Sequence, residues 1–382
     1  MAFELRTHAS ISEIGKAAWD ALLHPKDPPF LSYTWLSLLE KTGCVAPEKG
    51  WQPSHISLWE EGALVAVAPA YLKGNSEGEF VFDYSWAELS HQRLGTPYYP
   101  KLLLAVPFTP ASGPRLLVRE GHDEAQLLQV LAHALERLVG ELDCSSAHLL
   151  FPNRAQASIL ATTELLHRQG VQFHWTNYGY KSFDDFLARF SSKRRHQIRR
   201  ERREVLASGL EIRVHTGPSI TEEVVHAMYE FYADTVSKHY WGRHYLSREF
   251  FVEICTAMPE SLHIVMAWEG GKPIGGAFNI LGKDALYGRY WGARAERPFL
   301  HFEVCFYTGI EECIQRGLSI FEPGAGGEHK VARGFEPTAT DSWHYLKHPV
   351  LARAVGDFVA RERATIAQHI EAARAEGVLK GI

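Results

Sequence analysis

The chain has 382 residues, more than a single hydrophobic core usually supports, so two domains are expected. Hydrophobic residues make up 46% and charged residues 22% of the chain, as in an ordinary globular protein, which excludes the disordered and collagen-like classes. The net charge of −5 argues against nucleic-acid binding over the whole surface, so a polyanionic partner would need a local basic patch.

The amino-terminal stretch MAFELRTHASISEIG has no apolar run behind a basic start, so we expect no secretory signal. No window approaches ~18 uninterrupted apolar residues, so no transmembrane segment is expected. The cysteines are odd in number and lack CxxC spacing, which fits reduced thiols; they are Cys44, Cys144, Cys255, Cys305 and Cys313. We therefore expect a cytoplasmic protein, with peripheral contact at the inner membrane face left open.

The first half of the chain predicts a series of strands and helices. HISLWEEGALVAVAPAYL, from His55 to Leu72, is typical of a β-hairpin, and FVFDYSW, ending at Trp86, is expected to add a third strand. Asp123 to Leu142 has helical spacing of its leucines. A strand AHLLF, a helix from Ala155 to Gln169 and a strand VQFHW follow.

A basic segment, SSKRRHQIRRERRE, spans residues 191 to 204. Phe183, Phe186, Leu187 and Phe190 precede it, and with Ile198, Val205 and Leu206 they predict a helical stripe, so we expect an amphipathic basic helix. Most such runs are solvated faces. The alternative is a surface for tRNA, an acidic acyl carrier protein or anionic lipid. The side chains expected to bind such a partner are Lys193, Arg194, Arg195, Arg199, Arg200 and Arg203.

The second half repeats the pattern of the first. HIVMAWEGGKPIGGAFNIL, from His263 to Leu281, again begins with His-Ile and predicts a hairpin, and LYGRYWG, ending at Gly292, adds a strand. Residues 301 to 315 have helical spacing, LSIFE is a strand, residues 329 to 334 make a short helix at most, and residues 340 to 346 form a strand. We expect residues 3–178 and 179–346 to superpose, with an amphipathic helix from 349 to 382.

Residues 321 to 337, FEPGAGGEHKVARGFEP, run from the end of the strand LSIFE past the short helix and combine flexible backbone with titratable groups. Glycine gives room for close approach of a ligand, and the charged side chains would then orient it; the alternative is a simple turn. Its candidate donor- or substrate-binding residues are Glu322, Gly324, Gly326, Gly327, Glu328, Lys330 and Arg333. An aromatic segment, HYWGRHYLS, could line an acceptor pocket with Trp241 and Tyr245, or be a packed connection between helices.

This element order resembles the tandem acetyltransferase-like fold of the Fem family of aminoacyl-tRNA-dependent transferases. TPASGPRLLVREGHDEAQLLQVL, from Thr109, looks like the first-domain Fem pattern, and GAGGEHKVARGF, from Gly324, looks like the second-domain pattern. The whole chain, from PFLSYTWL through SSKRRHQIRRERR and LHFEVCFYTGIEECI to GEHKVARGFEPT, is similar to the Fem-like predicted N-acyltransferases. The resemblance covers residues 29 to about 349.

The resemblance implies an α/β protein with two tandem acetyltransferase-like domains, each a mixed, mainly antiparallel sheet flanked by helices. We place them at residues 1–178 and 179–348, the second expected to be catalytic, with a carboxy-terminal helix at 349–382. It also implies transfer of an acyl or aminoacyl group from an activated carrier to an amine. The donor stays open among acyl-CoA, acyl carrier protein and aminoacyl-tRNA, and the acceptor among peptidoglycan-type, lipid and small-molecule amines. No tightly bound cofactor is expected.

N-acyl transfer needs a proton acceptor for the amine and an acid for the leaving group. His301 and Glu303, at the start of a predicted helix, are candidate bases, or else they cap that helix and complement its dipole. Tyr290 could protonate the leaving atom, or be a core tyrosine. We expect His301, Glu303, Glu328 and His329 to converge on one cleft. Glu303 is the preferred base, and His329 completes the expected catalytic set.

Two rival interpretations stay open. One is a binding module for an anionic partner without catalysis. The other is a metal-dependent enzyme using His301, Glu303, Glu328 and His329, whose side chains suit zinc or iron, although two pairs joined only by folding are a weak signal. We assign no metal ligands on this pattern.

Overall fold

A computed structural model describes residues 3–238, 242–375 and 379, with the side chain of Glu328 left out. The chain divides into two compact units. Unit 1 comprises residues 1–171 and 339–369, and unit 2 comprises residues 172–338 and 370–382.

Unit 1 is built on a run of strands that Pro69 interrupts. β1 (Phe3–His8), β3 (His55–Glu60) and β4 (Ala63–Ala68) are antiparallel neighbours. After Pro69, which has no N–H for a ladder, the chain continues as β5 (Ala70–Lys73) and pairs with β6 (Lys101–Leu104). β6 then pairs in parallel with β8 (Ser146–Leu150). Two short strands, β2 (Trp51–Pro53) and β7 (Leu117–Val118), lie beside β5 and β4.

Unit 2 repeats this strand order. β10 (Glu211–His215), β11 (Leu262–Glu269), β12 (Lys272–Leu281) and β13 (Ala285–Ala293) are antiparallel neighbours, and β13 pairs in parallel with β14 (Ile320–Glu322). The hairpins that begin at His55 and His263 therefore occupy corresponding places, because each supplies the second and third strands counted from an edge strand. The tandem arrangement predicted from the sequence is confirmed at the level of strand order.

The two halves of the sequence exchange strands. β9 (Leu166–Thr176) ends in unit 2, where Trp175 and Thr176 pair with β14, and β15 (Glu336–Leu346) ends in unit 1, where residues 342–346 pair with β8. The bounds of the units therefore differ from the expected domains 1–178 and 179–348. Residues 339–348 belong with unit 1 because β15 completes that sheet, and most of the helix beyond 349 follows them.

Most expected elements are present, with corrections. FVFDYSW is no strand: only its last residues are regular, as the start of a helix, and the third strand of that half is β6. The expected helix from Ala155 to Gln169 ends at Leu160, since β9 begins at Leu166.

The helices of unit 1 are α1 (Lys16–Asp20), α2 (Tyr33–Lys41), α3 (Tyr84–Leu94), α4 (Glu124–Glu141), α5 (Arg154–Leu160) and most of α12 (Pro349–Ala375). Those of unit 2 are α6 (Phe183–Ala188), α7 (Ser192–Ala207), α8 (Glu222–Lys238), α9 (Arg248–Ala257), α10 (Leu300–Phe302) and α11 (Thr308–Arg316). Short turns of helix are η1 (Ile11–Glu13), η2 (Pro29–Leu31), η3 (Pro47–Lys49), η4 (Gly217–Ser219), η5 (Pro259–Ser261), η6 (Glu303–Tyr307) and η7 (Glu328–Arg333).

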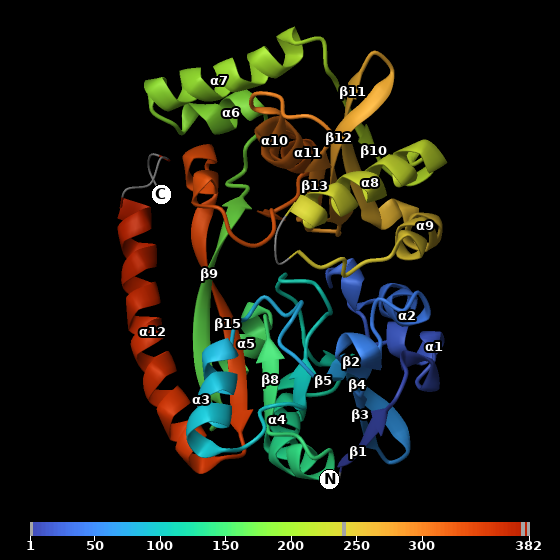
Figure 1. The fold of residues 1–382 in the computed structure, drawn as a ribbon, viewed down its shortest axis with the longest axis vertical. Helices are drawn as coiled ribbons and strands as arrows, with labels where there is room; N and C mark the ends of the chain where they lie inside the picture. The colour runs from blue at the N-terminus through green and yellow to red at the C-terminus, as the bar shows by residue number, and fades with distance from the viewer. Residues whose placement is uncertain (1–2, 239–241, 376–378, 380–382) are drawn as a thin grey trace. The chain divides into compact units, whose positions relative to one another are not determined.

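Amphipathic helices cover the strands of unit 1. Leu127, Leu131, Leu135 and Leu138 on α4 follow the spacing predicted from the sequence and lie in the core with the leucines of β6 and β8. Asp123 caps α4 by accepting hydrogen bonds from the N–H groups of residues 125 and 126. The long α12 runs beside β15 and α3 (Figure 1), where its leucine and valines form a second apolar cluster.

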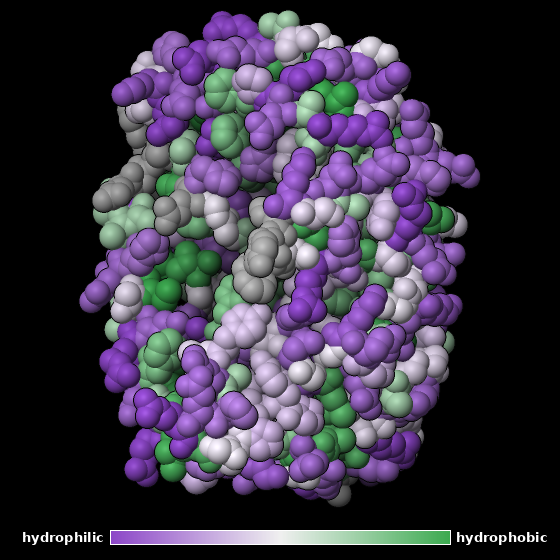
Figure 2. Space-filling model, viewed as in Figure 1, coloured by the Kyte–Doolittle hydropathy of each residue, from purple (hydrophilic) through white to green (hydrophobic). Residues whose placement is uncertain are grey.

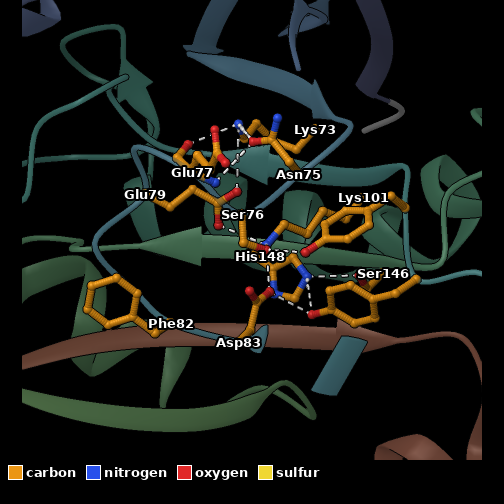
Figure 3. Close-up of polar contacts among 12 residues, drawn as sticks. Lys73, Asn75, Ser76, Glu77, Glu79, Phe82, Asp83, Lys101, Ser146 and His148 are labelled. Carbon is orange, nitrogen blue, oxygen red and sulfur yellow. Dashed lines mark hydrogen bonds and ion pairs between the residues drawn. The ribbon is translucent and has the colours of Figure 1, made fainter. Parts of the chain in front are cut away.

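Unit 1 also buries a network of charged groups (Figure 3). Lys101 on β6 has no exposed surface, and its Nζ donates hydrogen bonds to Ser76 Oγ at 2.8 Å, Glu79 Oε2 at 2.8 Å and Asp83 Oδ2 at 2.5 Å. Lys73 on β5 is equally buried, with its Nζ 3.9 Å from Glu79 Oε1. The network was not predicted from the sequence, because Lys101 lies 18 to 25 positions after its partners and the pairing of β5 with β6 is not visible in the spacing of these residues.

Candidate active site

A cavity of about 190 Å³ opens in unit 2 where β13 and β14 part. The two strands are paired only over residues 285–287 and 320–322, after which β14 ends and the chain turns at Pro323. Gly288 lets the chain pass closely at this point, since a Cβ there would lie 3.0 Å from the backbone of Pro323. β13 has a bulge opposite Asn279 of β12, so that β13 contains one extra residue at this point. The bulge changes the direction in which the side chains of β13 point.

The lining of the cavity combines strand, helix and loop residues. Its members are Ala277, Asn279, Gly288, Arg289, Tyr290, Trp291, His301, Cys305, Phe306, Pro323, Ala325, Gly326, Gly327, His329 and Lys330. The structure thus brings together Tyr290, His301, His329 and Lys330, four of the side chains expected at the site. None of the lining side chains that the structure describes is a carboxylate. The cavity consequently offers positive charge and neutral hydrogen-bonding groups.

The glycine-rich loop forms one wall. Gly324, Gly326 and Gly327 all have positive φ, between 70° and 90°, a conformation that glycine adopts without strain. Lys330 on η7 folds back on this loop and donates from Nζ to the carbonyl oxygen of Gly324 at 2.7 Å. Its side chain is buried, and burial lowers the pKa of Lys330 to about 8. The loop therefore holds a cation at the cavity wall.

His301 is held in its neutral form. Its ring lies 5.2 Å from the ring of Trp291 and 5.7 Å from that of His329, centroid to centroid. Burial, followed by the positive charges that His329 and Arg333 can carry, lowers the pKa of His301 to about 4. A neutral imidazole can accept a proton at neutral pH. The neighbouring His329 is exposed, and burial of part of its ring lowers its pKa as well.

Glu303, the expected base, does not line the cavity. Its side chain is 3% exposed, and its carboxylate accepts hydrogen bonds from Arg202 Nε at 3.0 Å and Arg202 Nη2 at 2.8 Å. Glu303 starts the π-helical turn η6, whose wider turn alters the direction of the side chains that follow α10. The expected shared cleft of Glu303 with His301 and His329 is therefore not formed, because Arg202 holds the carboxylate elsewhere.

Other candidate residues are also engaged elsewhere. Arg333 is buried; its Nη2 lies 3.2 Å from Glu201 Oε2, and its guanidinium stacks 3.2 Å from the ring centroid of Phe302. Glu322 lies 4.0 Å from His174 Nε2 and, like Gly324 and Tyr245, does not line the cavity. Trp241 and the side chain of Glu328 lie outside the described residues.

Three comparisons with known proteins bear on this geometry. A model of the family described as FemAB-like, peptidoglycan biosynthesis/recognition, matches residues 10–380. The chain belongs to the FemAB-like family. A search of the curated proteins finds no match. The match and the fold identify this FemAB-like chain as a transferase that acts on amino groups.

Solved structures share the fold at low sequence identity. The crystal structure of FemX is 11% identical, with a TM-score of 0.52, and the match covers 93% of this chain and 100% of FemX. The carboxy-terminal domain of a putative lysylphosphatidylglycerol synthetase from Agrobacterium fabrum is 11% identical, with a TM-score of 0.53, and the match covers 92% and 96% of the two chains. At such identities the likeness concerns the fold.

The basic helix of this FemAB-like protein exposes part of its charge. Lys193, Arg199, Arg200 and Arg203 are exposed on α7, and the surface over this helix is largely hydrophilic (Figure 2, top). Asp184 pairs with Arg199 at 2.8 Å and Glu204 with Arg200 at 3.3 Å. The expected apolar stripe is only partly correct. Ile198 and Val205 are buried, but Leu206 is 61% exposed. The phenylalanines before residue 191 lie on α6 or directly after it, and not on the basic helix.

Two further findings concern metal binding and membrane-spanning helices. Over the described residues, no group of three or more His, Cys, Asp and Glu side chains is placed to hold a metal ion. Among the same residues, no helix is long and apolar enough to cross a membrane.

Several lining residues were missed from the sequence. Asn279 and Trp291 were read only as parts of strands, and Cys305 only as one of the scattered cysteines. A polar asparagine within the apolar run GAFNIL was the one available signal, since a buried amide needs partners. The bulge that places Arg289 and Tyr290 could not be seen in the spacing.

Proposed function

We propose that unit 2 transfers an acyl or aminoacyl group from an activated carrier to an amine, in the cavity between β13 and β14. The observation that supports this most is the set of groups lining the cavity: neutral His301, the Tyr290 hydroxyl and the Lys330 ammonium, without a described carboxylate. They correspond to a proton acceptor, a proton donor and a positive charge for a developing oxyanion.

In the proposed reaction the nitrogen of the acceptor amine attacks the carbonyl carbon of the donor. As the C–N bond forms, the nitrogen loses a proton to the imidazole of His301. Lys330 stabilises the negative charge on the carbonyl oxygen. The bond to the carrier's sulfur or oxygen then breaks, and the leaving atom keeps the electron pair and takes a proton from Tyr290. The proton that His301 received returns to the tyrosine oxygen by way of solvent. Overall, one acyl group is transferred to the amine and no proton is consumed.

A second opening suggests where the carrier enters. A groove of about 650 Å³, also in unit 2, shares Trp291 and His301 with the cavity and is lined further by Lys238 and Arg297. We propose that the carrier arm lies in this groove and its acyl end in the smaller cavity. The family description, peptidoglycan biosynthesis/recognition, and the name of the similar putative lysylphosphatidylglycerol synthetase favour an aminoacyl donor and an acceptor from peptidoglycan or lipid synthesis. α7 is the proposed contact for the anionic partner, whether tRNA, acyl carrier protein or a membrane surface on the cytoplasmic side.

The test is direct. Purified full-length protein is incubated with acyl-CoA, acyl carrier protein thioester or aminoacyl-tRNA and a panel of amines, and transfer is followed by mass spectrometry, which also identifies molecules that co-purify. His301→Gln should lower the transfer rate by ~10²- to 10⁴-fold. The wild-type rate should fall as pH approaches about 4, the pKa of His301, and not near the ordinary value of ~6.5 for histidine. No transfer from any of the three donors would leave the chain without the activity proposed.

A further inference from the structure

A row of polar side chains leads from the surface of unit 2 to the cavity. Asn279 on β12 and His263 on β11 are partners in the strand register, so their side chains lie on the same face of the sheet. Asn279 Nδ2 is 3.2 Å from His263 Nδ1, and His263 Nε2 is 3.4 Å from Oε2 of Glu312 on α11. Asn279 lines the cavity, while Arg316 pairs with Glu312 near the surface at 2.8 Å.

The row is buried except at its outer end. His263 has no exposed surface and Asn279 is 3% exposed, whereas the side chain of Glu312 is 18% exposed. The nearby His263 ring, with Nε2 3.4 Å from the carboxylate, is the main cause that lowers the pKa of Glu312 to about 2, helped by Arg316, so Glu312 is a carboxylate at neutral pH. A carboxylate only accepts hydrogen bonds. The proton on the His263 ring is therefore favoured on Nε2, beside Glu312.

The position of that proton determines which atom of the Asn279 amide faces the cavity. With the proton on Nε2, a neutral His263 has an accepting lone pair on Nδ1, and Asn279 must use its NH2 group to reach it. The amide oxygen, Oδ1, is then the atom left for the cavity. If the proton were on Nδ1 instead, the amide would have to turn and present NH2.

The repeat in unit 1 provides an internal check on this ring orientation. His55 begins the corresponding hairpin, is equally buried, and has its Nε2 2.8 Å from Oε1 of Glu40. Its Nδ1 is 3.3 Å from the backbone nitrogen of Ala70, which can only donate. His55 therefore carries its proton on the nitrogen facing the glutamate. Unit 2 also has a glutamate beside its histidine, supplied by a helix after the hairpin and not before it, and has a side chain at the cavity in place of the backbone partner.

We propose that the Glu312–His263 pair positions Asn279 so that Oδ1 accepts a hydrogen bond from an N–H group of the substrate. Since no described lining residue is a carboxylate, Oδ1 is one of few acceptors the cavity offers to an N–H group. Such an N–H belongs either to the attacking amine or to an amide of the donor. Asn279 is the binding residue, and His263 and Glu312 are positioning residues. The inference rests on the proposed function for its substrate, but not for its geometry.

The geometry is tested without substrate. In protein labelled with ¹⁵N-histidine, long-range proton–nitrogen correlation distinguishes a protonated from an unprotonated ring nitrogen, and His263→Gln identifies the signals. We expect the proton of His263 on Nε2, as for His55. Glu312→Gln should shift the His263 signals, because a carboxamide no longer dictates the proton's place, whereas Glu311→Gln, one position away on α11, should not. A His263 proton on Nδ1, or on both nitrogens, overturns the proposal.

The binding role is tested in the transfer assay. Asn279→Ala should lower kcat/KM by about 5- to 10-fold, the value of one uncharged hydrogen bond, and Glu312→Gln by a smaller factor. A rise in KM for the amine assigns the N–H to the acceptor, and a rise in KM for the carrier assigns it to the donor. Unchanged kcat/KM in Asn279→Ala overturns the binding role. If wild type transfers nothing, the proposed function fails, while the tautomer measurement still decides whether Asn279 is positioned as described.

Discussion

Removal of the buried Lys101 ammonium should destabilise unit 1 strongly. In Lys101→Met the side chain keeps its length but leaves Glu79 and Asp83, at 2.8 and 2.5 Å, without their nearest positive charge. Lys73 is too far to replace it, at 3.9 Å from Glu79. Removing one partner of a buried ion pair typically costs about 3–5 kcal/mol. Burial already raises the pKa of Glu79 to about 7, so the unpaired charge is mainly that of Asp83, and we expect a loss of about 3 kcal/mol in the free energy of unfolding.

The loss should depend on pH in a defined direction. Burial alone raises the pKa of Asp83, but Lys101 outweighs this and holds it well below its ordinary value. In the wild type, Asp83 therefore contributes stability at pH values above its unfolded pKa, ~3.9, and this is lost as pH falls through its lower folded pKa. Without Lys101, burial dominates and the folded pKa rises. Ionised Asp83 then costs stability at pH 7, and less as the pH is lowered towards 5 and the carboxyl takes up its proton.

Urea denaturation at pH 7 and pH 5, followed by circular dichroism, measures both effects. Lys41→Met, an exposed lysine at the end of α2, is the control and should change stability by less than about 0.5 kcal/mol. Lys101→Met combined with Glu79→Gln and Asp83→Asn should recover part of the loss, because the two buried carboxylates are then gone, but not all of it, because Lys73 loses its partner Glu79. A Lys101→Met protein as stable as the control variant at pH 7 would refute the reasoning.

Three further outcomes are expected. Glu303→Gln should transfer at a rate within about threefold of wild type, because Glu303 lies outside the cavity, and a drop as large as that of His301→Gln would return the base role to Glu303. Reversing Arg199, Arg200 and Arg203 on α7 to Glu should weaken binding to an anionic partner most at low salt without altering the melting temperature, and unchanged affinity in filter-binding or vesicle-sedimentation assays would make this face a solvated surface. Gly292→Ala should destabilise the fold by several kcal/mol in urea denaturation, because a Cβ would lie 1.9 Å from the backbone oxygen of Phe231, whereas Gly140→Ala in α4, with nothing within 4 Å, should stabilise it by about 0.5–1 kcal/mol; equal effects would contradict the packing described.

The periodicity of apolar residues was sufficient to predict the elements that contact one another locally. The two His-Ile hairpins, α4 with its leucine spacing, and the helical stretch from residue 301 to 315 were all expected, because a strand or helix at a core must repeat its apolar side chains at the period of its backbone. The glycine loop was recognised from local sequence too, since a run of positive φ angles strongly favours glycine whatever surrounds it.

Partners distant in the sequence were decided only by the tertiary structure. Glu303 looks like a base in its own segment, but Arg202, about one hundred positions earlier, binds its carboxylate. FVFDYSW has the composition of a strand, yet β6 takes the third place in the sheet. Asn279 becomes a cavity residue because the register of β11 and β12 places it beside His263 and a bulge in β13 opens the space in front of it. Composition determines which side chains can be buried or charged. The pairing of strands and helices determines which of these side chains contact one another, and the chemistry of the site depends on those contacts.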